Sequence, residues 1–236
     1  MNLKIMSFNI QHCLNYISRR IEFDCFADAI RESGADIIGL NEVRDKGEDK
    51  DYQAQAKILA EKLGYHYYFA KAIDSQGVNP YGNALLSRYP ILSARTVMVP
   101  DPEVRGYEGY YETRCLLKAK IDVNGEVLTV CVIHFGLNPD EQENAVKTVL
   151  TSVEDEKCIL MGDFNVEPDN AVILPIGERL YDTAEQFGEP LLSWPSDKPK
   201  VKIDYIFTSR DIKVTSADIP AMIVSDHRPY LAEIEL

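Results

Sequence analysis

The 236-residue chain has 25 lysine and arginine residues against 38 aspartate and glutamate residues, a formal net charge of −13 at pH 7. Its apolar fraction of 45% and charged fraction of 27% are ordinary for a globular protein, and argue against a disordered or membrane-spanning chain. An acidic surface repels polyanions, so binding along an extended nucleic acid is possible but not favoured.

The start of the chain and its cysteines indicate a cellular compartment. The first residues, "MNLKIMSFN", enter an alternating strand pattern at once, without the pattern of a secretory signal. The five cysteines are odd in number and scattered, and they form no C-x-x-C pair. Such cysteines suit reduced core thiols better than disulfides or a zinc site. We therefore expect a cytoplasmic protein without a membrane role.

The first third of the chain reads as alternating strands and helices. Leu3 to Phe8 alternates as a strand, and about Asp24 to Ser33 has helical spacing and ends at Gly34. Residues 35–40 form a continuous apolar strand pattern, and a second helix is predicted over about 52–63. This order of elements is typical of an α/β domain.

The remainder is richer in strands. Four strand patterns cover residues 65–73, 83–88, 91–99 and 114–123, and Asn124-Gly125 predicts a tight hairpin to a strand over 126–135. Asn138, Pro139 and Glu141 then form a capping box that predicts a helix. A short strand beginning near residue 157, an irregular region over 166–199 and three final strands complete the chain. Two stacked mixed sheets with helices outside accommodate this order.

Polar side chains stand at the ends of five strands whose apolar pattern does not predict them. They are Asn9, Glu42, His134, Asp163 with Asn165, and Asp226 with His227. Each alone has a plain structural explanation, such as a loop cap or a buried imidazole with a hydrogen-bond partner. Structural explanations of this kind would have to apply at all five strand ends independently. Ligands, by contrast, commonly bind at the carboxyl ends of strands in α/β sheets, which would explain all five positions at once. We expect one shared site.

The residue types indicate the chemistry of that site. Carboxylates and an amide carbonyl without cysteine suit a hard cation such as Mg²⁺ or Mn²⁺. Two histidines can transfer protons or donate hydrogen bonds near neutral pH. Asp204 lies inside an otherwise apolar strand, where an ionised group needs a partner, and we expect that partner to be a histidine.

With these residues identified, the sequence resembles the endonuclease/exonuclease/phosphatase superfamily. The matching motifs follow in order along nearly the whole chain: "SFNI", "LNEV", "GNALLSRYPI", "ETRCL", "IHFG", "MGDFN", "IDYIF" and "SDHRP". The resemblance implies one domain over residues 1–236, a four-layer α/β/β/α sandwich with two packed mixed sheets, and divalent-metal-dependent hydrolysis of phosphate esters by in-line attack of water.

The resemblance also implies roles for individual residues. Glu42 would be the principal metal ligand, with Asn9 beside it and Asp226 on the same or a second ion. Asp163 and Asn165 would position the attacking water and the phosphate.

Four further residues match the family's pattern. His227, oriented by Asp204, would be the catalytic histidine. His134 would hydrogen-bond the phosphoryl oxygens as charge builds on them, and Arg114 could neutralise the charge on a further phosphoryl oxygen. The resemblance leaves open whether Asp163 or His227 accepts the proton of the water, and whether one or two ions act.

Substrate choice depends on loops that the motifs do not cover. The segment 100–114 carries three tyrosines beside Arg105 and Arg114, which could stack a ring next to a phosphate or simply pack; Trp194 could form an opposite wall or a core or loop anchor. The acidic charge favours a small or compact phosphate ester, with an endonuclease or exonuclease acting on DNA or RNA as the alternative. A non-catalytic binding module would have lost site residues, and every expected position is filled. The sequence does not predict an oligomeric state.

Overall fold

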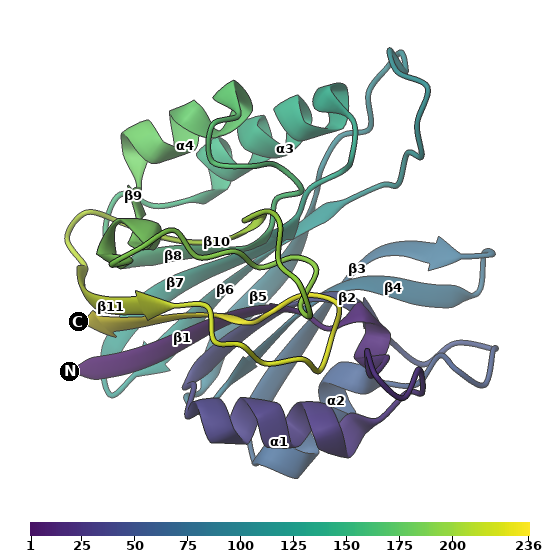
Figure 1. The fold of residues 1–236 in the computed structure, drawn as a ribbon, viewed down its shortest axis with the longest axis horizontal. Helices are drawn as coiled ribbons and strands as arrows, with labels where there is room; N and C mark the ends of the chain where they lie inside the picture. The colour runs from purple at the N-terminus through teal and green to yellow at the C-terminus, as the bar shows by residue number, and fades with distance from the viewer.

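The computed structural model describes all residues from 1 to 236, and Figure 1 shows two β-sheets packed against each other. Each sheet has six strands. The first sheet has the spatial order β11 (Lys213–Asp218), β12 (Tyr230–Glu235), β1 (Asn2–Asn9), β2 (Ile37–Arg44), β4 (Asn79–Ser87) and β3 (His66–Ser75). The second has the order β5 (Ile91–Met98), β6 (Cys115–Val123), β7 (Glu126–His134), β8 (Cys158–Asp163), β10 (Asp204–Thr208) and β9 (Tyr181–Asp182).

Both sheets are mixed, as predicted. Each contains one parallel pair, β1 with β2 in the first sheet and β7 with β8 in the second, and the remaining pairs are antiparallel. A parallel pair places the carboxyl ends of both its strands at the same edge of the sheet. Residues that follow β1 and β2, or β7 and β8, are therefore brought close together.

Helices cover the outer face of each sheet (Figure 1). Helices α1 (Phe23–Ser33) and α2 (Gln55–Leu63) pack on the first sheet, and α3 (Pro139–Ser152) and α4 (Leu174–Arg179) pack on the second. The structure thus has three apolar layers, one under each helix pair and one between the sheets. The predicted four-layer α/β/β/α sandwich is confirmed.

Strand alternation decides which side chains enter the layer between the sheets. In β1, Leu3 and Ile5 pack between the sheets, whereas Met6 and Phe8 pack under α1. The sheets approach closely at Gly39 of β2, where a Cβ would lie 2.6 Å from the Met161 sulfur of β8. A side chain at this position would force the Met161 side chain to move or the two sheets to separate.

Local sequence signals fix several element boundaries. Gly34 and Gly64 end α1 and α2 in the left-handed conformation, and Asn138 starts α3 with the predicted capping box. The Asn124-Gly125 turn has positive φ at both residues, as a two-residue hairpin loop requires.

Two of the predictions were wrong, one for the start of a helix and one for a region without regular structure. The second helix begins at Gln55, a turn later than expected, and the region 166–199, expected to be irregular, contains α4 and two 3-10 turns. Helix α4 is only six residues long and includes a proline and a glycine, so its sequence carries little periodic signal. None of the helices combines the length and the hydropathy that a membrane-spanning helix requires.

Candidate active site

The candidate site lies at the polar end of the layer between the sheets. Along β7 the inward-facing side chains run from Val130 and Val132 to His134, and along β8 they run from Met161 to Asp163. Because side chains two apart on a strand share a face, the strands that supply the apolar layer also deliver polar groups at its end. Asn9 ends the inward face of β1 in the same way.

Strand register brings three of the predicted residues together. His134 is the direct partner of Asp163 in the parallel β7–β8 pair, and Asp204 is the partner of Asp163 in the antiparallel β10–β8 pair. The first sheet contributes Asn9 to this group, because the Asn9 side-chain amide donates to Asp163 Oδ2 at 3.0 Å. Asp163 thus lies at the centre of a group assembled from both sheets.

Asp163 is 1% exposed and is held by several donors. Its Oδ1 accepts from the backbone N–H of Asn165 at 2.9 Å, and its Oδ2 lies 3.5 Å from Nε2 of both His134 and His227. Burial raises the pKa of Asp163 to about 7, with His227 lowering it and Asp204 raising it further. This carboxyl group can therefore exchange a proton near neutral pH.

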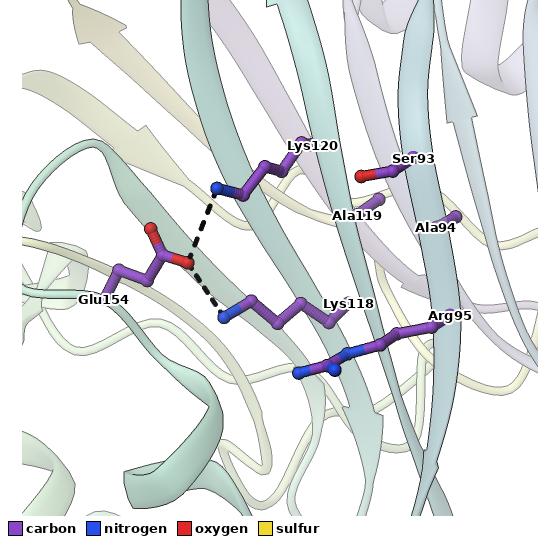
Figure 2. A pocket seen from close by; sticks show the side chains of 7 residues that line it. All are labelled: Ser93, Ala94, Arg95, Lys118, Ala119, Lys120 and Glu154. Carbon is purple, nitrogen blue, oxygen red and sulfur yellow. Dashed lines mark ion pairs between the residues drawn. The ribbon is translucent and has the colours of Figure 1, made fainter.

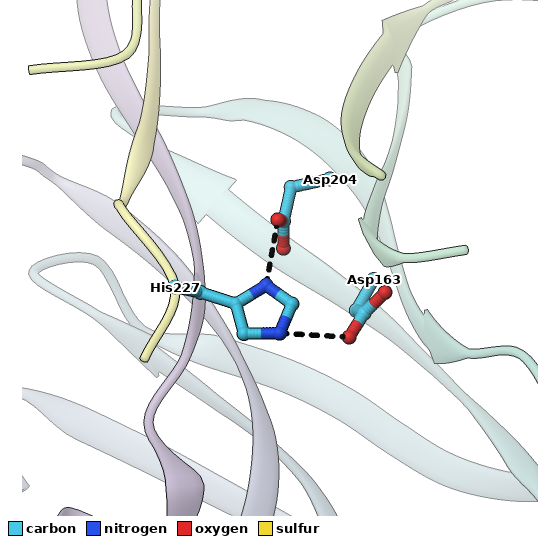
Figure 3. Close-up of side chains that lie close together, drawn as sticks. All are labelled: Asp163, Asp204 and His227. Carbon is cyan, nitrogen blue, oxygen red and sulfur yellow. Dashed lines mark hydrogen bonds and ion pairs between the residues drawn. The ribbon is translucent and has the colours of Figure 1, made fainter. Parts of the chain in front are cut away.

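His227 lies between two carboxylates, as Figure 3 shows. Its Nδ1 is 2.8 Å from Asp204 Oδ2, and its Nε2 faces Asp163. Burial disfavours the charged imidazolium, but Asp204 and Asp163 together overcome that cost and raise the pKa of His227 to about 10. The expected histidine partner of Asp204 is therefore His227.

The same three side chains could in principle hold a metal, because their ligand atoms lie within 4.8 Å of one another. However, the direct hydrogen bond between His227 and Asp204 already occupies Asp204 Oδ2 and the Nδ1 ring nitrogen of His227. A protonated His227 between Asp204 and Asp163 offsets part of their negative charge without an ion. We interpret these residues as a proton-transfer group rather than as ligands.

His134 is held as a neutral ring. An Arg114 guanidinium N–H lies 3.3 Å from Nδ1, which must accept because guanidinium can only donate. The ring proton is thereby assigned to Nε2, where Asp163 Oδ2 at 3.5 Å can accept it; the Asn165 amide nitrogen, 3.1 Å from Nε2, is itself a donor and cannot accept this proton. Burial, aided by Arg114 and His227, lowers the pKa of His134 well below its usual value. A neutral His134 can donate its Nε2 proton.

Glu42 and Asp226 form a separate acidic group beside Asn9. The Asn9 amide donates to Glu42 Oε1 at 3.1 Å, and Glu42 has a left-handed backbone (φ 58°) within a β-bulge of β2. Such strain in a residue other than glycine is typical of functional positions. Burial raises the pKa of Glu42, and the nearby Asp226 charge raises it further. A bound cation would remove this repulsion.

Gln11 provides the test of whether a cation fits. Its amide N–H donates to Asp226 Oδ2 at 3.2 Å, which leaves the carbonyl Oε1 buried without a hydrogen-bond partner. A buried acceptor without a donor is costly unless a cation or water satisfies it. Together Gln11, Glu42 and Asp226 offer oxygen ligands alone, which suit Mg²⁺ or Mn²⁺.

Sequence reasoning assigned no role to Gln11, nor to a buried amide pair that braces the site. Asn41 accepts from the backbone N–H of Asp163 at 2.9 Å and donates to the Ile133 carbonyl at 3.0 Å and to Asn83 at 2.8 Å. Asn83 in turn donates to the Cys115 carbonyl. Asn41 lies within the motif "LNEV" and Asn83 within "GNALLS", so the sequence indicated their positions but not the hydrogen bonds that they form.

A cavity of about 490 Å³ opens over these groups. Its lining includes seven of the predicted site residues: Glu42, Arg114, His134, Asp163, Asn165, Asp226 and His227. The other two, Asn9 and Asp204, are fully buried behind it. Tyr81, Tyr110, Glu112 and Trp194 also line the cavity, and Glu112 forms an ion pair with Arg114.

A cationic cavity lies elsewhere. Figure 2 shows Arg95, Lys118 and Lys120 on β5 and β6 around Glu154, in a cavity of about 330 Å³. Glu154 pairs with Lys118 at 2.9 Å and with Lys120 at 4.0 Å, so much of this positive charge is balanced. None of its lining residues lines the cavity that contains Asp163. This cluster therefore does not form a basic rim around the candidate active site.

Comparison with known proteins identifies the class to which this fold and site belong. Residues 6–227 match the profile of the Endonuclease/Exonuclease/phosphatase family, and the chain belongs to that family. Members of this family hydrolyse phosphate esters and typically depend on a divalent metal ion.

Individual relatives extend over the full chain. The Escherichia coli (strain K12) protein YbhP, described as uncharacterised, is 26% identical over 262 residues that span 100% of this chain and 97% of its own length. The crystal structure of an endonuclease/exonuclease/phosphatase from Beutenbergia cavernae has a TM-score of 0.81 at 23% identity and covers 100% of this chain and 72% of its own. The mannosyl-6-phosphatase Bt3783 of Bacteroides thetaiotaomicron has a TM-score of 0.80 at 18% identity and covers 99% of this chain and 100% of its own.

Proposed function

We propose that the protein is a divalent-metal-dependent hydrolase of phosphate esters that acts by in-line attack of water. The observation that carries this proposal is the position of Asp163 within 3.5 Å of two imidazoles, in a cavity that also holds Glu42 and Asp226. Proton-transfer groups, hydrogen-bond donors and carboxylates suited to a hard cation thus line the same cavity. Water attack also needs no serine or cysteine nucleophile.

The phosphoryl group would be bound on the β7–β8 side of the cavity. The Nε2 proton of His134 and the guanidinium of Arg114 both face the volume next to Asp163. Asn165, which has a left-handed backbone and donates hydrogen bonds to Asp163 and to the Phe135 carbonyl, supplies a further polar group there. Fixed donors aimed at charge that develops during reaction commonly contribute about 10²-fold or more each.

Proton transfer would involve Asp163 and His227. Both lie on the cavity wall, and their side chains are 3.5 Å apart. Asp204 fixes the imidazole orientation from behind through its 2.8 Å contact with Nδ1. The pair can accept the proton of the attacking water and return it to the leaving group.

Glu42, Asp226, Gln11 and Asn9 would hold the metal ion. When bound, a divalent ion at these oxygens would neutralise charge on the phosphoryl group and act as a Lewis acid. The Asn9 amide would keep Glu42 and Asp163 at a fixed separation, because it donates to both carboxylates.

A small or compact phosphate ester fits this cavity best. Its volume of about 490 Å³ lies in the range of small-molecule sites, and the cationic cluster of Figure 2 lies outside it. The Bacteroides thetaiotaomicron neighbour, whose name assigns it a sugar phosphate, supports this interpretation at the level of the fold. Apolar side chains of Trp194, Val201 and Ile203 would contact the uncharged part of the substrate.

The purified protein with Mn²⁺ or Mg²⁺ should be screened against phosphorylated sugars, nucleotides, lipid headgroups and short oligonucleotides. We expect turnover of at least one small ester, and loss of that turnover with EDTA and its recovery on adding metal. Absence of hydrolysis across the panel with both ions would contradict the proposal.

A nuclease is the second candidate, because Tyr110 (66% exposed) and Trp194 (39% exposed) line the cavity and could stack bases. A salt titration of binding to short DNA separates the two candidates. Affinity that is tight at low salt and falls steeply with salt would favour the nuclease, and negligible affinity at low salt would remove it.

A further inference from the structure

Glu112 lies in the loop between β5 and β6, on the wall of the cavity that contains Asp163. Its Oε1 accepts a hydrogen bond from Arg114 Nη1 at 2.5 Å, and its Oε2 accepts one from the Tyr110 hydroxyl at 3.1 Å. The side chain of Glu112 is 14% exposed and that of Arg114 is 11% exposed. Replacing such an ion pair with apolar side chains of similar volume is often neutral or stabilising, so stability alone does not account for it.

The guanidinium of Arg114 is placed for the site rather than for its own hydrogen bonding. Its Nε is buried without an acceptor, which is costly for a polar group. Its Nη1 carries two N–H groups and has two acceptors, Glu112 Oε1 at 2.5 Å and His134 Nδ1 at 3.3 Å. The other terminal nitrogen, Nη2, makes no hydrogen bond to the protein, and the side chain lines the cavity. Nη2 is therefore available to a phosphoryl oxygen.

The contact between Arg114 and His134 sets the tautomer of the imidazole. Because Nη1 can only donate, Nδ1 accepts, and the ring proton lies on Nε2, 3.5 Å from Asp163 Oδ2. A rotated guanidinium would release Nδ1 and permit the other tautomer, in which Nε2 no longer donates. Glu112 is the acceptor that prevents this rotation, because His134 is the one other group that accepts from Arg114.

The backbone of Glu112 is itself held by the first turn of α3. Its N–H donates to Glu141 Oε1 at 3.1 Å, and Glu141 is 5% exposed. Glu141 also forms the capping box of α3 with Asn138. The residues that start the helix thus anchor the chain beside the cavity, and a series of contacts runs from Glu141 through Glu112 and Arg114 to His134.

We propose that Glu112 is a positioning residue for the hydrolysis, which fixes the Arg114 guanidinium so that Nη1 sets the tautomer of His134 and Nη2 is left for the phosphoryl group. The inference rests on the proposed function, in which His134 and Arg114 bind that group. Glu112 acts through Arg114 rather than on the substrate, because both of its carboxylate oxygens already accept hydrogen bonds within the protein.

The test compares Glu112→Ala with Glu112→Gln. Glutamine keeps a carbonyl oxygen that can accept from Arg114, and its amide can donate to the Tyr110 hydroxyl. We expect Glu112→Ala to lower kcat/KM for a small phosphate ester about 10²-fold, the effect of a misplaced binding group. Glu112→Gln should stay within about threefold of the wild type, because a neutral acceptor weakens the hydrogen bond without removing it. Glu108→Ala, at an exposed position of the same loop, is the matched control and should keep wild-type kinetics.

A double-mutant cycle with Arg114→Ala asks whether Glu112 acts through Arg114. We expect Glu112→Ala to have little further effect on kcat/KM in the Arg114→Ala background. The nitrogen-15 resonance of His134 Nδ1 reports on the same contact without substrate. It should shift in Glu112→Ala toward the value of a ring nitrogen without a hydrogen bond, and stay near the wild-type value in Glu112→Gln. Its loss in His134→Phe identifies it among the four histidines.

Unchanged kcat/KM in Glu112→Ala with an active wild type would overturn the inference and leave the proposed function standing. Equal losses in Glu112→Ala and Glu112→Gln, or a further large loss in the Arg114→Ala background, would also overturn it, because the effect would then not come from the hydrogen bond to Arg114. A wild type without activity would instead refute the proposed function. An unshifted His134 resonance in Glu112→Ala would overturn the inference in either case.

Discussion

Asn9 at the end of β1 donates a hydrogen bond across the interface between the sheets to Asp163 at the end of β8, at 3.0 Å. The same amide nitrogen donates to Glu42 of its own sheet at 3.1 Å. One side chain therefore sets the separation between the expected metal ligand and the central carboxylate. Without it, the half-buried carboxylate of Glu42 and the buried carboxylate of Asp163 would lose their shared donor.

Replacing Asn9 with alanine should therefore reduce activity more than it reduces stability. We expect kcat/KM for a phosphate ester to fall by about 10²-fold, because both carboxylates lose their fixed position. The measurement is steady-state kinetics with metal in excess. The matched control is Asn2→Ala at the exposed start of the same strand, which should retain wild-type kinetics. Equal kinetics for Asn9→Ala and wild type would remove Asn9 from the site.

Glu42→Gln tests the metal site without any substrate. We expect Mn²⁺ to raise the Tm of the wild type and to have a much smaller effect on Glu42→Gln, since an ion present at about 100 times its Kd stabilises by about 2.7 kcal/mol. Without metal, the variant should be at least as stable as the wild type, because burial and Asp226 both disfavour the Glu42 charge. Glu126→Gln, at an exposed ion pair with Lys157, is the control. Equal metal-induced shifts in Glu42→Gln and wild type would place the ion elsewhere.

Asn41→Ala should destabilise the fold. It removes three buried hydrogen bonds and leaves the Ile133 carbonyl, Asn83 and the Asp163 N–H without their partner. We expect a loss of about 2–3 kcal/mol in the free energy of unfolding, measured by urea denaturation. A loss within about 0.5 kcal/mol, the range of an ordinary surface substitution, would show that the hydrogen bonds of Asn41 do not hold the sheets together.

Lys202 should make stability depend on alkaline pH. Its pKa is about 8 in the folded protein against 10.5 for a lysine exposed to water, so the folded state binds fewer protons than the unfolded state between these values. The nearest carboxylate oxygen to the ammonium is on Asp182, 4.0 Å away, and the rings of Tyr205 and Tyr230 lie beside it; the charge of Asp204 opposes the shift less than that of Asp182. Wild-type stability should therefore rise through this window relative to Lys202→Met, by roughly 3 kcal/mol in total.

The advantage of Lys202→Met over wild type should thus be largest below pH 8 and disappear above about pH 10.5. Urea denaturation of both proteins across this range measures it. A difference between the two proteins that does not vary with pH would mean that Lys202 is charged in the folded state to the same extent as in the unfolded state.

Much of the fold could be predicted because its signals are local. The capping box at Asn138, the glycines after α1 and α2 and the Asn124-Gly125 turn each fix a boundary by backbone geometry. Helix α4 was missed because its six residues are held by packing on the second sheet rather than by their own helical preference. The one-domain expectation for 1–236 remains a prediction, which a single cooperative unfolding transition would support.

The candidate site was predictable for residues that end a strand with an unexpected polar group. His134 and Asp163 are of this kind, and the parallel register of β7 and β8 pairs them directly. The contacts of Asn41, Gln11 and Lys202 depend on how the sheets pack, and a single sequence contains no signal for such distances. The contacts of these residues therefore emerged only from the structure.

The most direct measurement is metal-dependent hydrolysis of a chromogenic phosphodiester by the wild type and by Glu42→Gln, Asp163→Asn and His227→Ala. The account predicts activity in the wild type that requires added Mg²⁺ or Mn²⁺, and a loss of at least about 10²-fold in each variant with the folded structure retained by circular dichroism. Wild-type activity that survives in any of the three variants would contradict the role given to that residue. Survival in all three would show that the group around Asp163 is not the active site.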